Sequence, residues 1–428
     1  MAGTPDLRPA GAVGGAPLGT PARRILLVDA DAFFVAVARQ VDPEGAGRAR
    51  LLIVGGSPDS RGVVCSASYE TRAFGVRSAM PMARAVRLCP QAMVVPVPRR
   101  ECHERSRAIA DVLARFAPVI QASSIDEWYL DLSGTEALFG HEPLATTARR
   151  LRDAVRAATG LSVSIGGGTS RLVAKLAVEV AKPKPGTGAD GVHVVAPGNE
   201  GAFMTRFALA DLPFVGPRFQ ERLAKFGLRT VPDALAYDEA SLVRLLGERE
   251  GRWLHERIRG VDASRVEPRE EAKSVSREET FARDLHDDAA IERELLRLVE
   301  RVGADLRGDR LRARTVTVKL KDADFVQRQA GRTLRQGVET DRAILQVARE
   351  LLRRLRQARR VGARLVGVTL SQFDAPDAPR QLTLFDDDAP APNEVAETER
   401  DRRLAQTVDA IRERFGRGAI GPARLLGD

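Results

Sequence analysis

The stretch RILLVDADAFF, residues 24–34, decides how the chain begins to fold. Its apolar half has the composition of a buried strand, and Asp29 follows that half directly. A second stretch of the same kind is SSIDEWYLDL, residues 123–132, in which Asp126 and Glu127 open another strand. Each stretch therefore combines a strand with acidic side chains at its end.

The pattern between and after these stretches predicts a ferredoxin-like sheet. A long insertion follows the first strand, and after it come a helix over Arg105–Phe116 and a strand over Val119–Ala122. The second stretch is followed by an amphipathic helix, Ala145–Ala158, and a strand, Leu161–Gly166. The order strand, insertion, helix, strand, strand, helix, strand is the split βαβ arrangement. The insertion is expected to form a subdomain of its own.

Asp29, Asp126 and Glu127 are expected to meet at one edge of this sheet, because strand ends in a split βαβ sheet can lie side by side. Acidic groups so close together repel one another unless a cation neutralises them. Mg²⁺ is commonly held by one or two carboxylates and by substrate phosphates. Two such ions about 3.5–4 Å apart stabilise the attacking and leaving oxygens of a phosphoryl transfer. Taken singly, an aspartate at a strand end is usually a cap or turn residue, so the motif depends on its surroundings.

The rest of the chain falls into a helical region and a second mixed region. The helical region contains Leu212-Pro-Phe-Val-Gly-Pro217 between helical segments, and a charged linker follows it. In the mixed region the strand Thr315–Lys321 alternates, so its valines and leucine share one face and its threonines and lysines the other. Two amphipathic helices, Ile291–Leu306 and Arg342–Leu355, can cover the apolar face. The Thr/Lys face suits an anionic ligand, although for one strand alone a solvated face is the more common explanation.

Composition narrows the class of protein without deciding it. The chain has 428 residues, which suits several domains, and 67 basic against 58 acidic residues give a net charge of +9. Such a balance favours a polyanionic partner, either nucleic acid or an acidic membrane surface. The three cysteines and five histidines lack metal-ligand spacing, so no zinc site is expected. Sparse cysteines favour a reducing cytoplasm, and no apolar run is long enough to cross a bilayer.

Five segments of the chain resemble the Y-family DNA polymerases, in particular the bacterial DNA polymerase IV (DinB) group. The segments are VDADAFF (Val28–Phe34), GVVCSASYETRAFGVRSAMPM (Gly62–Met82), SSIDEWYLDL (Ser123–Leu132), AKLAVEVAKPKPG (Ala174–Gly186) and KSVSREETF (Lys273–Phe281). They occur in the family's order. The resemblance implies an α+β multidomain fold with a ferredoxin-like palm, a fingers insertion, a helical thumb containing a helix-hairpin-helix, and an α/β little-finger domain.

The regions found from composition and pattern correspond in turn to these domains, which gives the following expected boundaries. They are a flexible arm over 1–23, a palm over 24–31 and 98–186, fingers over 32–97, a thumb over 187–266, a linker over 267–273, a little finger over 274–374 and a tail over 375–428.

By the same resemblance, the metal ligands are Asp29, Asp126, Glu127 and the backbone carbonyl of Ala30. Two Mg²⁺ ions are implied, with Mn²⁺ as an alternative. The residues that match the nucleotide site are Phe33, Phe34, Ser66, Tyr69, Arg72 and Lys182. Phe34 falls at the steric gate, where a ring under the sugar excludes the 2′-hydroxyl of a ribonucleotide, whereas Phe33 is better explained as a core residue. Arg72 suits a phosphate because its planar guanidinium forms two parallel hydrogen bonds.

The DNA-binding residues implied by the family lie in the thumb and the little finger. They are Val215 and Gly216 of the hairpin and Thr315, Thr317, Lys319 and Lys321 of the sheet. Three positions depart from the family pattern. Phe214 stands where Gly is usual and is expected to distort the hairpin, Trp128 stands where a small residue is common, and Lys184-Pro185 stands where Asn-Gly is usual.

The tail contains QLTLF, residues 381–385, which resembles the peptide that binds the bacterial sliding clamp. Leu382, Leu384 and Phe385 would fill an apolar groove while Gln381 makes polar contacts. An amphipathic segment, Leu404–Phe415, comes later in the tail, and we expect a helix that docks on the rest of the protein.

Taken together, these features predict a monomeric, cytoplasmic, low-fidelity DNA polymerase for translesion synthesis, which joins deoxynucleoside triphosphates on primer–template DNA without proofreading. Two alternatives come from other classes. One is a catalytically silent polymerase-fold scaffold, which the presence of all the acidic ligands disfavours. The other is a nucleotide cyclase, which also uses a split βαβ fold but needs neither the hairpin nor the clamp peptide.

Overall fold

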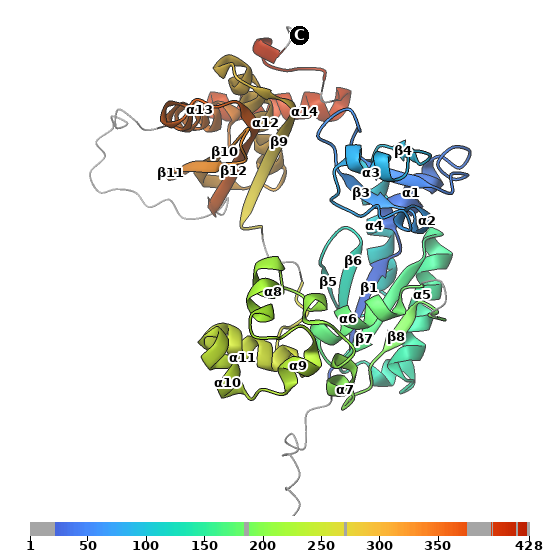
Figure 1. Ribbon diagram of the computed structural model, residues 1–428. Coiled ribbons are helices and arrows are strands. Elements are labelled where there is room, and N and C mark those ends of the chain that lie inside the picture. Colours follow the sequence, from blue (N-terminus) through green and yellow to red (C-terminus); the bar gives the residue numbers. More distant parts are fainter. Residues whose placement is uncertain are drawn as a thin grey trace, which may run out of the picture. The chain divides into compact units, whose positions relative to one another are not determined.

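The computed structural model describes residues 22–183, 188–268, 272–374, 395, 397–416 and 418–425 (Figure 1). The chain divides into two compact units. The first consists of Met1–Gly56, Val63–Met80 and Arg84–Glu270, and the second of Ser57–Gly62, Pro81–Ala83 and Glu271–Asp428. The expected flexible arm, the Lys184-Pro185 departure and the QLTLF peptide fall wholly or almost wholly outside the described residues.

A five-stranded sheet organises the first unit. Its strands are β1 (Ile25–Ala30), β5 (Val119–Ala122), β6 (Glu127–Asp131), β7 (Val163–Gly168) and β8 (Val192–Val194). They lie in the order β5-β6-β1-β7-β8, and all neighbours are antiparallel except β7 and β8. The first four strands and their helices follow the split βαβ order expected from the sequence, with β1 at the centre. The three-residue strand β8 was not expected.

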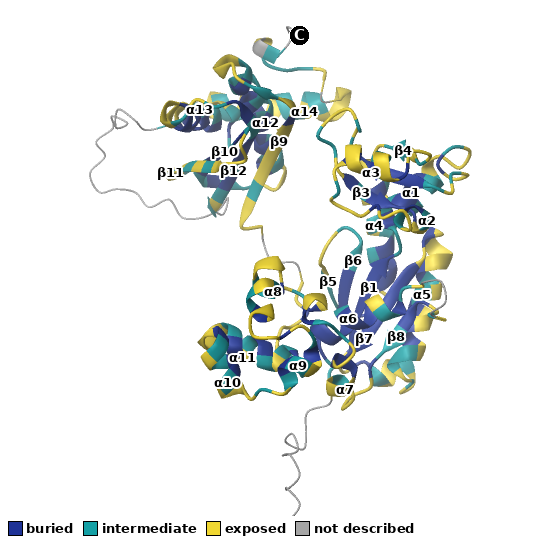
Figure 2. Ribbon diagram, viewed as in Figure 1, coloured by how far each residue is buried: buried dark blue, intermediate teal, exposed yellow. Residues whose placement is uncertain are grey.

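Helices cover both faces of this sheet, which explains why β1 is buried along its whole length. The helices α4 (Arg99–Leu113) and α5 (Leu144–Thr159) share a core with Leu26 and Val28. On the opposite face α6 (Arg171–Ala181) packs against Ile25 and Leu27. Figure 2 shows the central strands as buried. The 3₁₀ turn η1 (Glu136–Phe139) precedes α5.

Close approach of α6 to β7 depends on glycine. A Cβ atom added to Gly166 would lie 2.1 Å from the backbone nitrogen of Val178 and 2.2 Å from the carbonyl oxygen of Ala174, both in α6. The run of glycines at the end of β7 therefore lets a helix lie directly on the sheet.

The insertion after β1 contains a three-stranded sheet of its own. The helix α1 (Phe33–Val41) follows β1 after Ala32, which has a positive φ of 46°. A three-stranded sheet in the order β3-β2-β4 consists of β2 (Leu52–Gly55), β3 (Val64–Ala67) and β4 (Met93–Val95), and the helices with it are α2 (Tyr69–Arg72) and α3 (Met82–Leu88).

Short helices form the last part of the first unit. They are α7 (Glu200–Met204), η2 (Leu209–Asp211), α8 (Pro217–Ala224), α9 (Val231–Leu235), α10 (Glu239–Leu246) and α11 (Glu248–Arg257). Their apolar residues share one cluster with Leu172, Val173 and Leu176 of α6. This helical region is therefore packed on the same helix that covers the five-stranded sheet.

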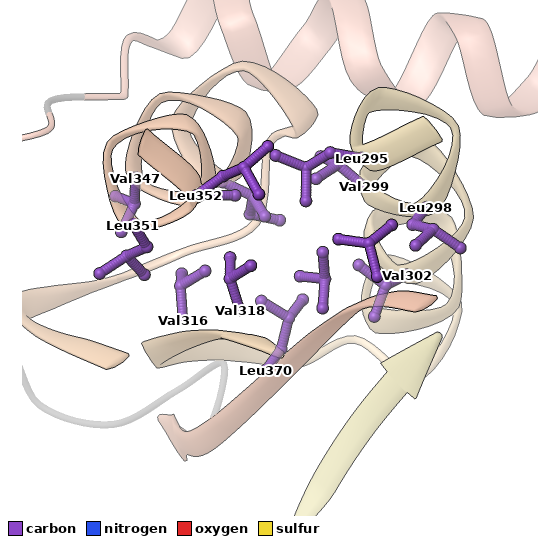
Figure 3. Packing of buried hydrophobic residues seen from close by; sticks show 14 of the residues in the cluster. Leu295, Leu298, Val299, Val302, Val316, Val318, Val347, Leu351, Leu352 and Leu370 are labelled. Atoms are coloured by element: carbon purple, nitrogen blue, oxygen red, sulfur yellow. The ribbon is translucent and has the colours of Figure 1, made fainter. Parts of the chain in front are cut away.

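The second unit has a sheet with one apolar face. Its strands are β9 (Ser274–Leu285), β10 (Arg312–Asp322), β11 (Gln327–Val338) and β12 (Ala363–Asp374), in the antiparallel order β11-β10-β12-β9. The helices α12 (Asp288–Gly308) and α13 (Asp341–Ala358) pack on the side where Val316, Val318 and Leu370 project (Figure 3). The alternation predicted for Thr315–Lys321 is thus confirmed.

A C-terminal helix, α14 (Glu399–Phe415), is held against α12 by charged side chains. Arg307 donates to both carboxylate oxygens of Asp409 at 2.6 and 3.0 Å, and Arg412 pairs with Glu300 at 2.5 Å. Within α14, Ala405 is the buried residue, while Leu404 is 63% exposed and Phe415 is 66% exposed. The docking helix expected from the sequence is therefore present, but ion pairs and not an apolar face attach it. The 3₁₀ turn η3 (Ala423–Leu425) follows.

Among the described residues, none of the helices combines the length and the apolar character needed to cross a bilayer.

Candidate active site

Strand register brings two of the three predicted carboxylates face to face. In the antiparallel pair of β1 and β6, Asp29 lies directly opposite Glu127. The residue Asp29 is only 8% exposed, although its carboxyl is polar. One step further along β1, the backbone N–H of Ala30 donates to the carbonyl oxygen of Asp126 at 2.9 Å. The β1–β6 pairing therefore places all the predicted metal ligands at one end of the sheet.

Two lysines from α6 and its C-cap contact these carboxylates. Lys182 lies with its ammonium nitrogen 3.1 Å from Oδ2 of Asp29, and it also bonds Glu179. Lys175 donates a hydrogen bond to Glu127. The two lysines are seven residues apart, which is about two helical turns, so they lie on the same face of α6. Positive charge thus stands beside each carboxylate of the opposed pair.

The electrostatics of the pair are asymmetric. Burial is the largest cause that raises the pKa of Asp29 to about 7; Lys182 opposes this shift and the neighbouring Glu127 contributes to it. Burial also acts on Glu127, but the hydrogen bond and charge of Lys175 outweigh it and hold the pKa of Glu127 below its usual range. A buried carboxyl that ionises with difficulty is one that a metal cation would stabilise in its charged form.

Asp126 faces a different partner. The hydroxyl of Ser124 donates a hydrogen bond to the Asp126 carboxylate, and the backbone N–H of Asp126 donates to Ser124 Oγ at 3.2 Å. In the part of the chain that the structure describes, no three His, Cys, Asp or Glu side chains are gathered closely enough to hold a metal ion as they stand. Asp29 and Glu127 are brought together, and Asp126 adjoins them through the backbone while its carboxylate is bonded to Ser124.

Of the predicted nucleotide residues, Tyr69 is affected by the charges at this end of the sheet. Tyr69 opens α2 and is 41% exposed, and the guanidinium of Arg72 lies 4.9 Å from the centre of its ring. Burial raises the pKa of Tyr69, and the charges of Asp31 and Asp29 contribute, so the phenol is within electrostatic range of the carboxylates. Arg72 Nε donates to the carbonyl oxygen of Ala67 at 2.9 Å, which fixes the side chain at the base of α2.

Phe33 and Phe34 differ in exposure. Phe33 is 2% exposed and belongs to the core beneath β1, which fits its interpretation as a packing residue. Phe34 is half-buried and meets the Phe33 ring edge-on, with 5.6 Å between ring centroids. Ser66 is buried within β3. Trp128, the unusual residue of the second motif, is 1% exposed and is accommodated in the same core as Phe33.

The turn before α8 accommodates Phe214 through an uncommon backbone conformation. Phe214 has a φ of 71°, in the left-handed region, and its side chain is 90% exposed. Val215 is buried, and its N–H donates to Leu212 within the turn at 3.1 Å, so its side chain contributes to the core. Gly216 is exposed and is the N-cap of α8. Phe214 therefore adopts a backbone conformation that Gly reaches more easily, and whether the turn is distorted relative to the family stays a prediction.

Sequence reasoning missed four polar residues of the site. They are Lys175, Ser124, Ser164 and Asp31, of which Ser164 donates to Asp31 at 2.7 Å. A signal for Lys175 was present, because it precedes Lys182 by two helical turns in an otherwise apolar segment. No sequence signal distinguishes Ser124 or Ser164 from ordinary strand-end serines.

Comparison with known proteins adds to this geometry. Residues 28–179 match the impB/mucB/samB family, and residues 272–384 match the C-terminal domain of that family. The DNA polymerase IV of Desulfatibacillum aliphaticivorans is 36% identical over 405 residues, which cover 94% of this chain and 97% of the relative. The DNA polymerase IV of Caulobacter vibrioides is 36% identical over 93% of both chains.

The chain belongs to the DNA polymerase IV (DinB) group of the Y-family polymerases. It is a DNA-directed DNA polymerase of the translesion class, and the cyclase and silent-scaffold alternatives are set aside.

Solved structures agree on the fold. A Y-family DNA polymerase chimera superposes with a TM-score of 0.71 at 23% identity, covering 82% of this chain and 99% of the chimera. DinB from Sulfolobus solfataricus gives a TM-score of 0.54 at 24% identity, covering 81% and 98%. The mixed α and β fold of this DinB polymerase is therefore that of the Y family.

Proposed function

We propose that Asp29, Asp126 and Glu127 form a two-metal-ion centre that joins deoxynucleotides on a DNA template. The observation that supports this most strongly is the burial of Asp29 opposite Glu127, with a pKa of about 7 for Asp29. Burying one carboxyl against another is unfavourable unless a cation compensates. Oxygen ligands of this type suit Mg²⁺, with Mn²⁺ as an alternative.

The metals, when bound by Asp29, Asp126, Glu127 and the Ala30 carbonyl, would neutralise the charge of the triphosphate and of the attacking 3′-oxygen. The remaining work falls to positioning. Lys182 forms an ion pair with Asp29, and its ammonium group can pair with the triphosphate instead. Lys175 keeps Glu127 ionised by holding its pKa low.

The fingers side of the site suits the triphosphate and the sugar. Tyr69 and Arg72 are stacked on one another at the start of α2, and Ser66 lies in the adjoining strand. Arg72 can hold phosphate oxygens in two places at once, and Tyr69 can add a hydroxyl donor. Phe34 is half-buried at the start of α1, and it is the residue proposed to exclude the 2′-hydroxyl of a ribonucleotide, as a steric gate.

The same proposal assigns subdomains. The five-stranded sheet with α4, α5 and α6 corresponds to the palm, and the insertion with β2, β3 and β4 to the fingers. The helices α7–α11 correspond to the thumb, and the sheet β9–β12 with α12 and α13 to the little finger. A cytoplasmic location is part of the proposal and is supported by the three unpaired cysteines.

Two surfaces are assigned to primer–template DNA. One is the exposed N-terminus of α8 at Gly216, where backbone N–H groups can meet a phosphate. The other is the face of β10 opposite the helices, with Thr315, Thr317, Lys319 and Lys321, each partly exposed. Hydroxyl and ammonium donors of this kind suit phosphates and make no demand on base sequence.

A bacterial sliding clamp is the proposed protein partner, through Gln381, Leu382, Leu384 and Phe385. The support is the sequence of the peptide, because these residues lie outside the described part of the chain. The double variant Leu384→Ala/Phe385→Ala should extend a short primer as well as the parent does without clamp, but lose the stimulation that added clamp gives. Equal stimulation of both proteins would reject the peptide assignment.

Primer extension with the purified chain tests the proposal as a whole. We expect template-directed incorporation of deoxynucleotides that needs Mg²⁺ and stops with chelator. Asp126→Ala should fold, because Asp126 is partly exposed, but should not extend the primer. Absence of Mg²⁺-dependent extension by the parent would contradict the function, and extension by Asp126→Ala would contradict the site.

A further inference from the structure

A row of three residues crosses the outer face of the second sheet. Lys319 of β10 is paired with Gly367 of β12, and Gly367 is paired with Glu278 of β9. The neighbours of Lys319, Val318 and Leu320, point into the helix-covered core, so Lys319 points the other way. The row therefore lies on the face that carries the Thr/Lys stripe.

Glycine in the middle of this row lets the outer two side chains meet. A Cβ atom added to Gly367 would lie 2.8 Å from Cγ of Glu278, which is closer than such contacts allow. The Glu278 side chain thus lies over the β12 backbone, and its carboxylate accepts a hydrogen bond from the Lys319 ammonium group. An acidic group from the edge strand reaches across a whole strand to a basic residue.

The ion pair is open to solvent. The side chains of Lys319 and Glu278 are 27% and 34% exposed, so a phosphate can approach the lysine. Exposed ion pairs are held weakly and their partners exchange readily. A DNA phosphate that binds Lys319 must displace the Glu278 carboxylate or lie beside it, and like charges repel.

We propose that Glu278 limits the affinity of this face for DNA by competing with phosphate for Lys319. The proposal rests on the assignment of the β10 face to DNA. It gives a chemical reason for short residence on the template: one phosphate contact of the face is balanced by an internal carboxylate. Glu278 acts through Lys319 and is a positioning residue for DNA, not a catalytic one.

A matched control lies next to Glu278 on the same strand. Glu279 is paired with Val366, whose side chain is in the core, so it belongs to the opposite face of the sheet. Its carboxylate is 3.9 Å from Arg301 of α12. Glu279→Gln therefore changes the net charge as much as Glu278→Gln does, but away from Lys319.

The test is binding of fluorescent primer–template DNA to the full chain at several salt concentrations. Glu278→Gln should lower Kd by about threefold to tenfold near 0.1 M salt and steepen the log–log salt slope by about 0.9, the value for one added phosphate contact. Glu279→Gln should leave Kd and slope near those of the parent. In Lys319→Gln, which should bind more weakly than the parent, adding Glu278→Gln should give no further gain.

The outcomes separate the two levels of the proposal. If Lys319→Gln binds DNA as tightly as the parent, the β10 face is not a DNA surface and the function assigned to it is wrong. If Lys319→Gln weakens binding but Glu278→Gln does not tighten it, or weakens it too, Glu278 does not compete with DNA. Equal tightening by Glu279→Gln would mean that only net charge matters, and would also overturn the proposal.

Discussion

Asp29 is held in the least favourable environment of the residues assigned to the active site. Its carboxyl is buried in the central strand, opposite Glu127, and Lys182 offsets only part of the cost. Functional sites commonly hold groups that reduce stability, because the strain is relieved when the ligand binds. This side chain should therefore contribute to the pH dependence of the stability of the metal-free protein.

The pH dependence has a definite sign. The folded protein keeps the Asp29 proton up to about pH 7, whereas the unfolded chain loses it near the usual value of 3.8, so stability falls as pH rises from 4 to 7. Asp29→Asn removes this loss. In metal-free buffer at pH 8 the variant should have a higher Tm than the parent and a free energy of unfolding greater by on the order of 1–4 kcal/mol. Near pH 4 the two proteins should be equally stable. A variant that is less stable at pH 8, or a difference that does not vary with pH, would contradict the electrostatic explanation.

Phe34 should determine how well the enzyme discriminates against ribonucleotides. A half-buried ring at the start of α1 can exclude a 2′-hydroxyl by its bulk. Phe34→Ala should raise the ratio of kcat/KM for a ribonucleotide to that for the matching deoxynucleotide by about 10²-fold. Phe34→Tyr keeps the ring and should keep the discrimination. Unchanged discrimination in Phe34→Ala, measured by single-nucleotide incorporation, would place the gate elsewhere.

Among the elements, the turn before α8 contains a residue that departs from the expected family pattern. Phe214 keeps the left-handed φ that Gly would adopt, and its side chain projects into solvent. A side chain at positive φ costs about 1–2 kcal/mol, and the greater freedom of unfolded Gly offsets about 0.5–1 kcal/mol of that. The left-handed conformation of Phe214 therefore carries an energetic cost.

Phe214→Gly should therefore stabilise the protein by about 0.5–1 kcal/mol, measured by denaturant unfolding. Phe214→Ala is the control, because alanine keeps Cβ and the backbone strain while removing the ring. If both variants change stability equally, the ring and not the backbone conformation is responsible.

Some helices and strands could be predicted from the sequence more accurately than others. β5 and α5 lie within one residue of the ends expected from the sequence, because apolar periodicity and Pro or Gly boundaries specify them locally. β4 and β8 were not expected, since a three-residue strand forms only where a neighbour offers pairing.

In the site, Asp29 and Glu127 could be predicted as neighbours from topology. The position of Lys175 and the bond between Ser124 and Asp126 could not, because they depend on how α6 and the β5–β6 turn pack.

In the whole molecule, the main sheets of the two units differ in how many of their faces are covered by helices. The first buries its central strand between helices and places carboxylates at the end of that strand. The second covers one face with α12 and α13 and leaves the other polar. The proposed catalytic site thus lies in one unit, and the proposed electrostatic contact with DNA lies partly in the other.

Asp29 and Asp126 are proposed to belong to one catalytic centre. This is tested by the single-turnover rate at which Asp29→Asn, Asp126→Asn and the double variant add one deoxynucleotide to a primer. Each single change should slow the step by about 10³-fold or more, and the double variant should be no slower than the worse single variant, because groups that act as a unit are not additive. Effects that multiply, or a single variant that retains the parent's rate, would contradict the account.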